Sequence, residues 1–144
     1  MANHIFNELG FPILLIDPPM MEFRGEVFPA PNMRDLQLAV FRMLVHKPTR
    51  LTGDELKFIR GHQRLRQADF AKVLHMANHS VVAQWEGKNE RPTGMAYNTE
   101  VVLRIWMAGR IGEGDQVMSL LDGELRELKP GPGEPLVVEL PRVA

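Results

Sequence analysis

The stretch QADFAKVLHMANHSVVAQWE, residues 67–86, constrains the fold of this chain more than any other segment. Phe70, Val73 and Leu74 fall on one face at helical spacing, which predicts a short amphipathic helix at the start of the stretch. The small side chain of Ala71 suits a position where a second helix crosses closely. The pattern predicts two short helices joined by a turn.

The second helix is expected from His79 to Glu86, with Asn78 as its N-cap. Either Val81 or Val82 should be buried together with Trp85. The opposite face then carries small, amide and imidazole side chains: His79, Ser80, Ala83 and Gln84. Such a face, flanked by Lys and Arg, suits the reading of base edges in the major groove of DNA. An ordinary buried helical hairpin is the alternative that the pattern leaves open.

The surrounding residues resemble the helix-turn-helix of the Cro/C1-repressor (XRE) family. The shared hallmarks are a Gln that opens the first of the two helices, Phe70-Ala71, Trp-Glu-Gly at 85–87 and Arg91-Pro92. The phrase LTGDELKFIR at 51–60, followed later by Pro-Thr-Gly, is most similar to the domain of MqsA-type antitoxins and their zinc-free relatives. The resemblance spans roughly residues 50–110 and implies DNA binding.

The chain departs from the family pattern in the turn between the two helices. The interval from Gln67 to Trp85 is one residue longer than in the family, and His75 or Met76 stands where the family has Gly. Gly is favoured there because it adopts a left-handed conformation without strain. We therefore expect an irregular turn at residues 75–78.

The resemblance also implies which residues touch DNA. Matched backwards from Trp85, the base readers are Ser80 and Gln84, with His79 beside them. A Gln side chain can bond both N6 and N7 of adenine, and Ser serves several bases. The residues expected to contact phosphates are Arg64, Arg66, Gln67, Asn78, Lys88 and Arg91. Phosphate contacts hold the protein in register without reading sequence.

The distribution of charge favours this location for a DNA-binding surface. The formal net charge is −1, but residues 47–91 carry nine basic and five acidic side chains, whereas residues 111–144 carry three and seven. Neutralising phosphates requires basic groups locally rather than over the whole chain. Chance clustering on a solvated surface is the alternative reading of the same counts.

Composition places the chain among ordinary soluble proteins, with 44% apolar and 24% charged residues. Its longest apolar runs, such as PILLI at 12–16, are far too short to span a membrane, and the first ten residues lack the pattern of a signal peptide. There is no cysteine, which excludes disulfides, iron–sulfur clusters and a zinc ribbon. We expect a cytoplasmic protein.

The expected fold class is mainly α with a small β element: a five-helix Cro/C1-type helix-turn-helix domain flanked by short N- and C-terminal strands. Strands are predicted at 11–16, on both sides of a turn at Arg24-Gly25-Glu26, and at 135–140. The first and last can pair within the chain or with a second copy. Helices are expected at about 32–46, 52–64, 95–108 and 113–128, besides the two described above. The helix at 95–108 carries the apolar residues Val101, Val102, Ile105 and Trp106.

Three segments follow from this reading. Residues 1–47 form an N-terminal dimerisation or partner-binding part, 48–110 the DNA-binding domain, and 111–144 a C-terminal helix and strand. The five histidines form no metal-ligand pattern, and no nucleophile or phosphate loop has its required context, so we expect no enzyme, cofactor or metal.

The predicted function is a sequence-specific transcriptional regulator that acts as a dimer on a palindromic operator and represses its own gene. One alternative is an antitoxin that binds a cognate toxin protein and also represses its own operon. Another is an interaction scaffold that does not bind DNA.

Overall fold

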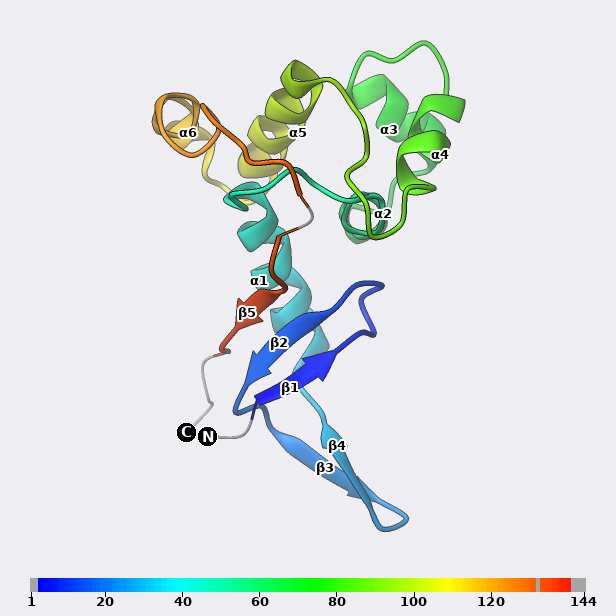
Figure 1. Cartoon of the computed structure of the whole chain (residues 1–144), viewed down its shortest axis with the longest axis vertical. Helices are drawn as coiled ribbons and strands as arrows, with labels where there is room; N and C mark the ends of the chain where they lie inside the picture. The colour runs from blue at the N-terminus through cyan, green and yellow to red at the C-terminus, as the bar shows by residue number, and fades with distance from the viewer. Residues whose placement is uncertain (1–2, 132, 141–144) are drawn as a thin grey trace. The chain divides into compact units, whose positions relative to one another are not determined.

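The computed structural model describes residues 3–131 and 133–140, which fall into two compact units. The first unit contains the residues up to Val40 together with those from Glu134 onward, and the second is Phe41–Gly133. The elements in chain order (Figure 1) are β1 (Asn3–Phe6), β2 (Ile13–Ile16), β3 (Met20–Phe23), β4 (Glu26–Pro29), α1 (Met33–Val45), α2 (Gly53–His62), α3 (Gln67–Val73), α4 (Ser80–Glu86), α5 (Tyr97–Arg110), the 3-10 turn η1 (Gly114–Gln116), α6 (Val117–Asp122) and β5 (Leu136–Val138).

The expected fold class was wrong. The described residues form six α-helices and five strands in two sheets, with 44% of residues helical and 17% in strands. This is a mixed α/β fold rather than five helices flanked by terminal strands. Each strand has only three or four residues, too few for an alternating pattern to stand out in the sequence. β1 was missed for that reason.

A three-stranded sheet with the order β1-β2-β5 organises the first unit (Figure 1). β2 pairs antiparallel with β1 and parallel with β5, so the first and last predicted strands join within one chain. Ile13 and Leu15 alternate with less buried neighbours, as expected for a strand covered on one face. Their buried companions in this unit include Phe6, Leu36 and Val138.

β3 and β4 form a separate two-stranded hairpin in the same unit. Arg24 (φ 51°) and Gly25 (φ 81°) are the two residues of its turn. Two consecutive left-handed residues characterise a type I′ turn, whose twist matches that of the strands. The predicted turn is confirmed.

Capping residues set the start of the first two helices as the sequence predicted. The Asn32 side-chain oxygen accepts a hydrogen bond from the Asp35 N–H at 3.1 Å. At α2, Thr52 Oγ1 accepts from the Glu55 N–H at 3.2 Å, and Glu55 Oε1 accepts from the Thr52 N–H at 2.9 Å. This reciprocal pair is a capping box, and it satisfies two donors that the helix leaves unpaired.

A buried ionic cluster connects α5 to the segment between α1 and α2. The Arg104 guanidinium donates to Glu100 Oε2 at 2.6 Å and to the carbonyl oxygens of Lys47 and Thr49 at 2.5 and 2.7 Å. Glu100 also accepts from Arg50 Nε at 2.8 Å. Burial lowers the pKa of Arg104, while Glu100 opposes this shift. The cluster holds the chain that leads into α2.

The inner face of α5 is not made by the apolar residues Val101, Val102, Ile105 and Trp106. Val102 is exposed, and the buried positions are Glu100, Leu103, Arg104, Met107 and Ala108. Two charged residues lie on the inner face because they neutralise each other and bond the buried carbonyls. If only apolar side chains of α5 were buried, the helix would have to be rotated about its axis, away from the face that is buried in the structure.

The helix expected at 113–128 is also shorter than predicted. It consists of η1 and α6, and α6 ends before Gly123, which adopts φ −112° and ψ −104°. Leu125 and Leu128 are nevertheless buried, in the turns that follow. Their spacing reflects packing of an irregular segment rather than a continuous helix.

Candidate nucleic-acid interface

α3 begins at Gln67, as predicted, and its start is held by Arg66 and Asp69. The Asp69 carboxylate accepts from the Arg66 backbone N–H at 3.3 Å and from its Nε at 3.0 Å. These bonds raise the pKa of the Arg66 guanidinium and lower that of the Asp69 carboxyl. Phe70 and Ala71 are buried, which agrees with close helix crossing at Ala71.

The turn after α3 contains a residue with a left-handed backbone conformation, at a position where glycine is the usual residue. His75 has φ 57°. Its N–H bonds the Lys72 carbonyl at 3.1 Å, and the Met76 N–H bonds the Ala71 carbonyl at 2.8 Å. This pair of hydrogen bonds is a Schellman motif, which usually has Gly at the left-handed position. His75 therefore occupies the position that glycine usually takes in this motif, and its side chain is exposed.

α4 begins at Ser80, one residue later than predicted, although His79 already has helical backbone angles (φ −73°, ψ −15°). The Asn78 side-chain oxygen accepts from the Ser80 backbone N–H at 3.0 Å and from the Ser80 hydroxyl. Asn78 thus caps this end of the helix as expected. Its side-chain oxygen is engaged within the protein, as is the hydroxyl hydrogen of Ser80.

The two faces of α4 differ as the sequence indicated. Val82 and Trp85 are buried, and Val81 is only partly covered. The exposed positions before and within the helix are His79, Ser80, Ala83 and Gln84. Ser80 and Gln84 lie four residues apart and so share one face. The three predicted base readers are brought together on this exposed surface.

Glu86 fixes the end of α4 to both preceding helices. Its carboxylate accepts from Arg60 Nε at 2.6 Å and Nη2 at 3.0 Å, and from Gln67 Nε2 at 3.3 Å. The bonded carboxylate raises the pKa of the Arg60 guanidinium. Sequence reasoning missed this function of Glu86 and Arg60. The only available signal was Trp-Glu-Gly as a family hallmark, which gives no partner.

The loop after α4 is held against the start of α2. The Gly53 N–H donates to the Arg91 carbonyl at 3.1 Å, and the Asp54 N–H donates to the Asn89 carbonyl at 2.9 Å. Lys88 and Arg91 themselves are exposed. The loop that presents these two basic residues therefore has a fixed backbone.

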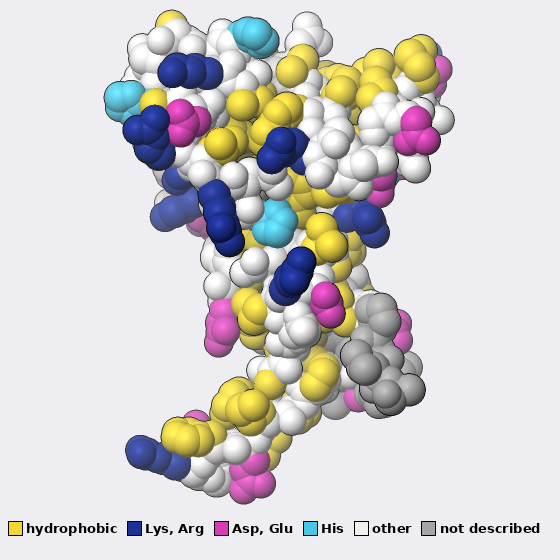
Figure 2. Space-filling model, turned by 180° about the vertical axis from the view of Figure 1, so that it is seen from behind, with side chains coloured by type: hydrophobic (Ala, Val, Ile, Leu, Met, Phe, Trp, Pro, Cys, Tyr) yellow, Lys and Arg dark blue, Asp and Glu magenta, His cyan; other side chains and the backbone are white. Residues whose placement is uncertain are grey.

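The residues predicted to contact phosphates differ in whether their side chains already form ion pairs or hydrogen bonds within the protein. Within residues 3–131 and 133–140, Arg64, Lys88 and Arg91 form no ion pair, whereas Arg66 is paired with Asp69. Gln67 donates to Glu86. Figure 2 shows basic and histidine side chains on the part of the second unit that carries α2 to α4. Exposed, unpaired cations are the groups most available to an external anion.

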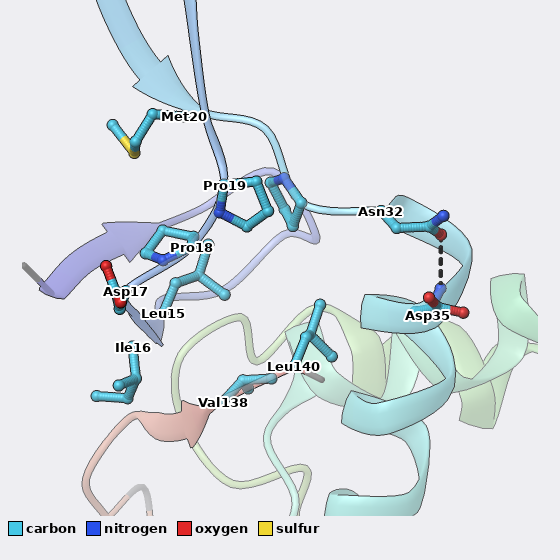
Figure 3. Close-up of a pocket in the computed structure, with 11 residues that line it drawn as sticks. Leu15, Ile16, Asp17, Pro18, Pro19, Met20, Asn32, Asp35, Val138 and Leu140 are labelled. Carbon is cyan, nitrogen blue, oxygen red and sulfur yellow. Dashed lines mark hydrogen bonds between the residues drawn. The ribbon is translucent and has the colours of Figure 1, made fainter. Parts of the chain in front are cut away.

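A separate cavity of about 530 Å³ lies in the first unit. Figure 3 shows it lined by the end of β2, the two prolines that follow, and residues before and within the start of α1. Val138 and Leu140 close another side. None of the residues predicted to contact DNA lines this cavity.

Two kinds of site are absent from the described part of the chain. No group of three or more His, Cys, Asp or Glu side chains is arranged to hold a metal ion. No helix there has the length and apolar character needed to cross a membrane. Comparison with family models, curated proteins and solved structures finds no match for this chain.

Proposed function

We propose that this protein is a sequence-specific DNA-binding regulator that acts as a dimer on two half-sites. The observation that carries the proposal is the exposed face of α4, with His79, Ser80 and Gln84 outward while Val82 and Trp85 are buried. A short helix with polar side chains outward, presented by a preceding helix, is the form in which helix-turn-helix proteins enter the major groove.

The residues on and around this face can supply the two kinds of contact that such binding requires, contacts to base edges and contacts to phosphates. Gln84 has an amide free to bond a base edge, and Ser80 keeps oxygen lone pairs for the same purpose. Lys88 and Arg91 follow on a loop whose backbone is bonded to α2, and Arg64 is exposed in the turn between α2 and α3. These cations supply the sequence-independent part of the affinity.

The test is binding of the full chain to the DNA upstream of its own gene, followed by footprinting of the protected bases. Gln84→Ala should weaken specific binding by about 1–3 kcal/mol and relax the preference at one base position. Binding to random DNA should barely change. Gln116→Ala is the matched control, because Gln116 is also exposed but lies outside α3 and α4.

The same measurements separate the alternatives. Equal loss of specific and random affinity in Gln84→Ala would make Gln84 a backbone contact and contradict the proposed base readers. Failure of the wild-type protein to bind any upstream fragment at low salt would favour an interaction scaffold instead.

A further inference from the structure

The β3–β4 hairpin exposes more apolar side chain than any other element of the first unit. Phe23 and Val27 are 61% and 62% exposed, Met21 is 54% exposed, and Met20 and Phe28 are exposed as well. Figure 2 shows apolar side chains along the hairpin. An isolated two-stranded hairpin is only marginally stable in water. The exposed side chains of this hairpin are mostly apolar, and Glu22, Arg24 and Glu26 are its charged residues.

The apolar side chains lie on both faces of the hairpin. Cross-strand pairing of Met21 with Phe28 puts these two on one face, together with Phe23 two residues further along. Met20 and Val27 belong to the opposite face. Strands that read as apolar on both faces are typical of strands that are covered on both sides.

We propose that this hairpin is a dimerisation arm that packs against a second copy of the chain. The inference deepens the proposed function and rests on it, because reading two half-sites requires a protein dimer. A two-fold pair presents the same patch from each copy, so the patch must be compatible with itself. The hairpin meets this condition because Arg24 lies between Glu22 and Glu26 in sequence and can meet the acidic residues of the other copy.

The exposed area is of the size that such a pair needs. Five partly exposed Phe, Met and Val side chains offer an apolar area on the order of 500 Å² per copy. Because these side chains lie on both faces, the two arms must intertwine so that each is covered on both sides. Two copies paired in this way would together bury about 1,000 Å², the lower limit for a specific interface. The apolar surface also continues from Met20 into the cavity of the first unit, which adds contact area for the arm of a partner.

The test is sedimentation equilibrium of the full-length protein over a range of concentrations. The wild type should be a dimer, and Phe23→Lys should raise its dissociation constant at least about tenfold, as expected for an aromatic anchor at an interface. Met118→Lys is the matched control, because Met118 is 67% exposed but lies on α6 in the second unit. It should sediment like the wild type.

A second measurement does not depend on a destabilising substitution. The chain contains no cysteine, so Ala30→Cys provides a single site for a nitroxide spin label directly after the hairpin, outside the proposed contact. Dipolar coupling between the labels of two copies is expected, and it should disappear when labelled protein is diluted with unlabelled wild type.

The possible outcomes distinguish a failure of the proposed dimerisation arm from a failure of the proposed DNA-binding function. A monomeric wild type, or a Phe23→Lys variant that dimerises like the wild type, would overturn the arm, and so would a hairpin covered only by a different protein. If Phe23→Lys is monomeric but retains weak binding to a single half-site, both proposals stand. If the arm dimerises the protein but no variant binds upstream DNA, the proposed function alone fails.

Discussion

Gly53, the first residue of α2, lies against the end of α4. A Cβ atom added at Gly53 would come within 2.6 Å of the Glu86 carbonyl oxygen and 2.7 Å of the Trp85 carbonyl oxygen and the Asn89 nitrogen. All three are backbone atoms, which cannot rotate away as a side chain can. The contact between α2 and α4 therefore depends on the absence of a side chain at this position.

Gly53→Ala should accordingly lower the free energy of unfolding by about 1–3 kcal/mol, the usual cost of overpacking. Gly61→Ala on the same helix is the control, since nothing lies within 4 Å of a Cβ atom there. Gly61→Ala should instead stabilise by about 0.5–1 kcal/mol, because Ala has the higher helix propensity. Urea unfolding of both variants checks the pair, and equal effects would contradict the close contact.

His75→Gly should raise the free energy of unfolding by up to about 1 kcal/mol, because Gly adopts the left-handed conformation without the steric cost of a Cβ atom. Lys72→Gly is the control within α3, where the same substitution should destabilise by about 1 kcal/mol. Thermal unfolding of the two variants measures both. A His75→Gly variant less stable than the wild type would show that the imidazole makes a contribution that the turn geometry does not explain.

At this scale the sequence was informative where a side chain acts on neighbouring backbone. The caps at Asn32, Thr52 and Asn78 followed from residue type and position, because such bonds span only two or three residues. The close approach of other backbone atoms to Gly53 could not be anticipated. These atoms belong to residues more than thirty positions away in the sequence, and they come near Gly53 only in the folded chain.

Among the elements, α4 has the most specific attachment, through the Glu86 carboxylate. Glu86→Gln should lower the free energy of unfolding by about 2–3 kcal/mol, because it leaves the largely buried Arg60 guanidinium without its counter-charge. Glu90→Gln is the control, since Glu90 is exposed and makes no ion pair within the described residues. Urea unfolding distinguishes them; a Glu86→Gln variant as stable as Glu90→Gln would show that the clamp contributes nothing.

The elements that sequence reasoning missed were those whose stability comes from distant partners. Glu100 and Arg104 look like one exposed pair of charges on a helix, but carbonyl groups from the α1–α2 segment make their burial favourable. β1 is a strand because β2 lies beside it, and four residues carry too little periodicity to reveal this. By contrast, α3 and α4 were recognised because their buried positions recur at helical spacing within the segment itself.

For the molecule as a whole, a formal net charge of −1 implies that the proposed DNA binding would depend on local cations. Lys88→Ala should weaken binding to operator and random DNA alike, and should lower the slope of log affinity against log salt by about 1 for the phosphate contact removed. Arg34→Ala, a change in α1 of the first unit, is the control and should leave the slope unchanged. An unchanged slope in folded Lys88→Ala would place this loop away from the DNA.

The pairing of the strands near the two ends of the chain could not be predicted from the sequence. The apolar runs at 11–16 and 135–140 were recognised as strands, but their partners were not, since the same runs suit pairing within or between chains. The parallel register of β2 with β5 joins segments more than one hundred residues apart. Only the hairpin, whose two strands are joined by two residues, had its partner defined by local sequence.

The anchoring of the loop after α4 also makes two amides into reporters of its movement. The Gly53 and Asp54 N–H groups belong to the first turn of a helix, where intrahelical acceptors are absent, and the Arg91 and Asn89 carbonyls accept them instead. Each separation of the loop from α2 would open both amides to deuterium from solvent. Their exchange rates therefore measure how often the loop detaches, and bound DNA should slow exchange at these two positions.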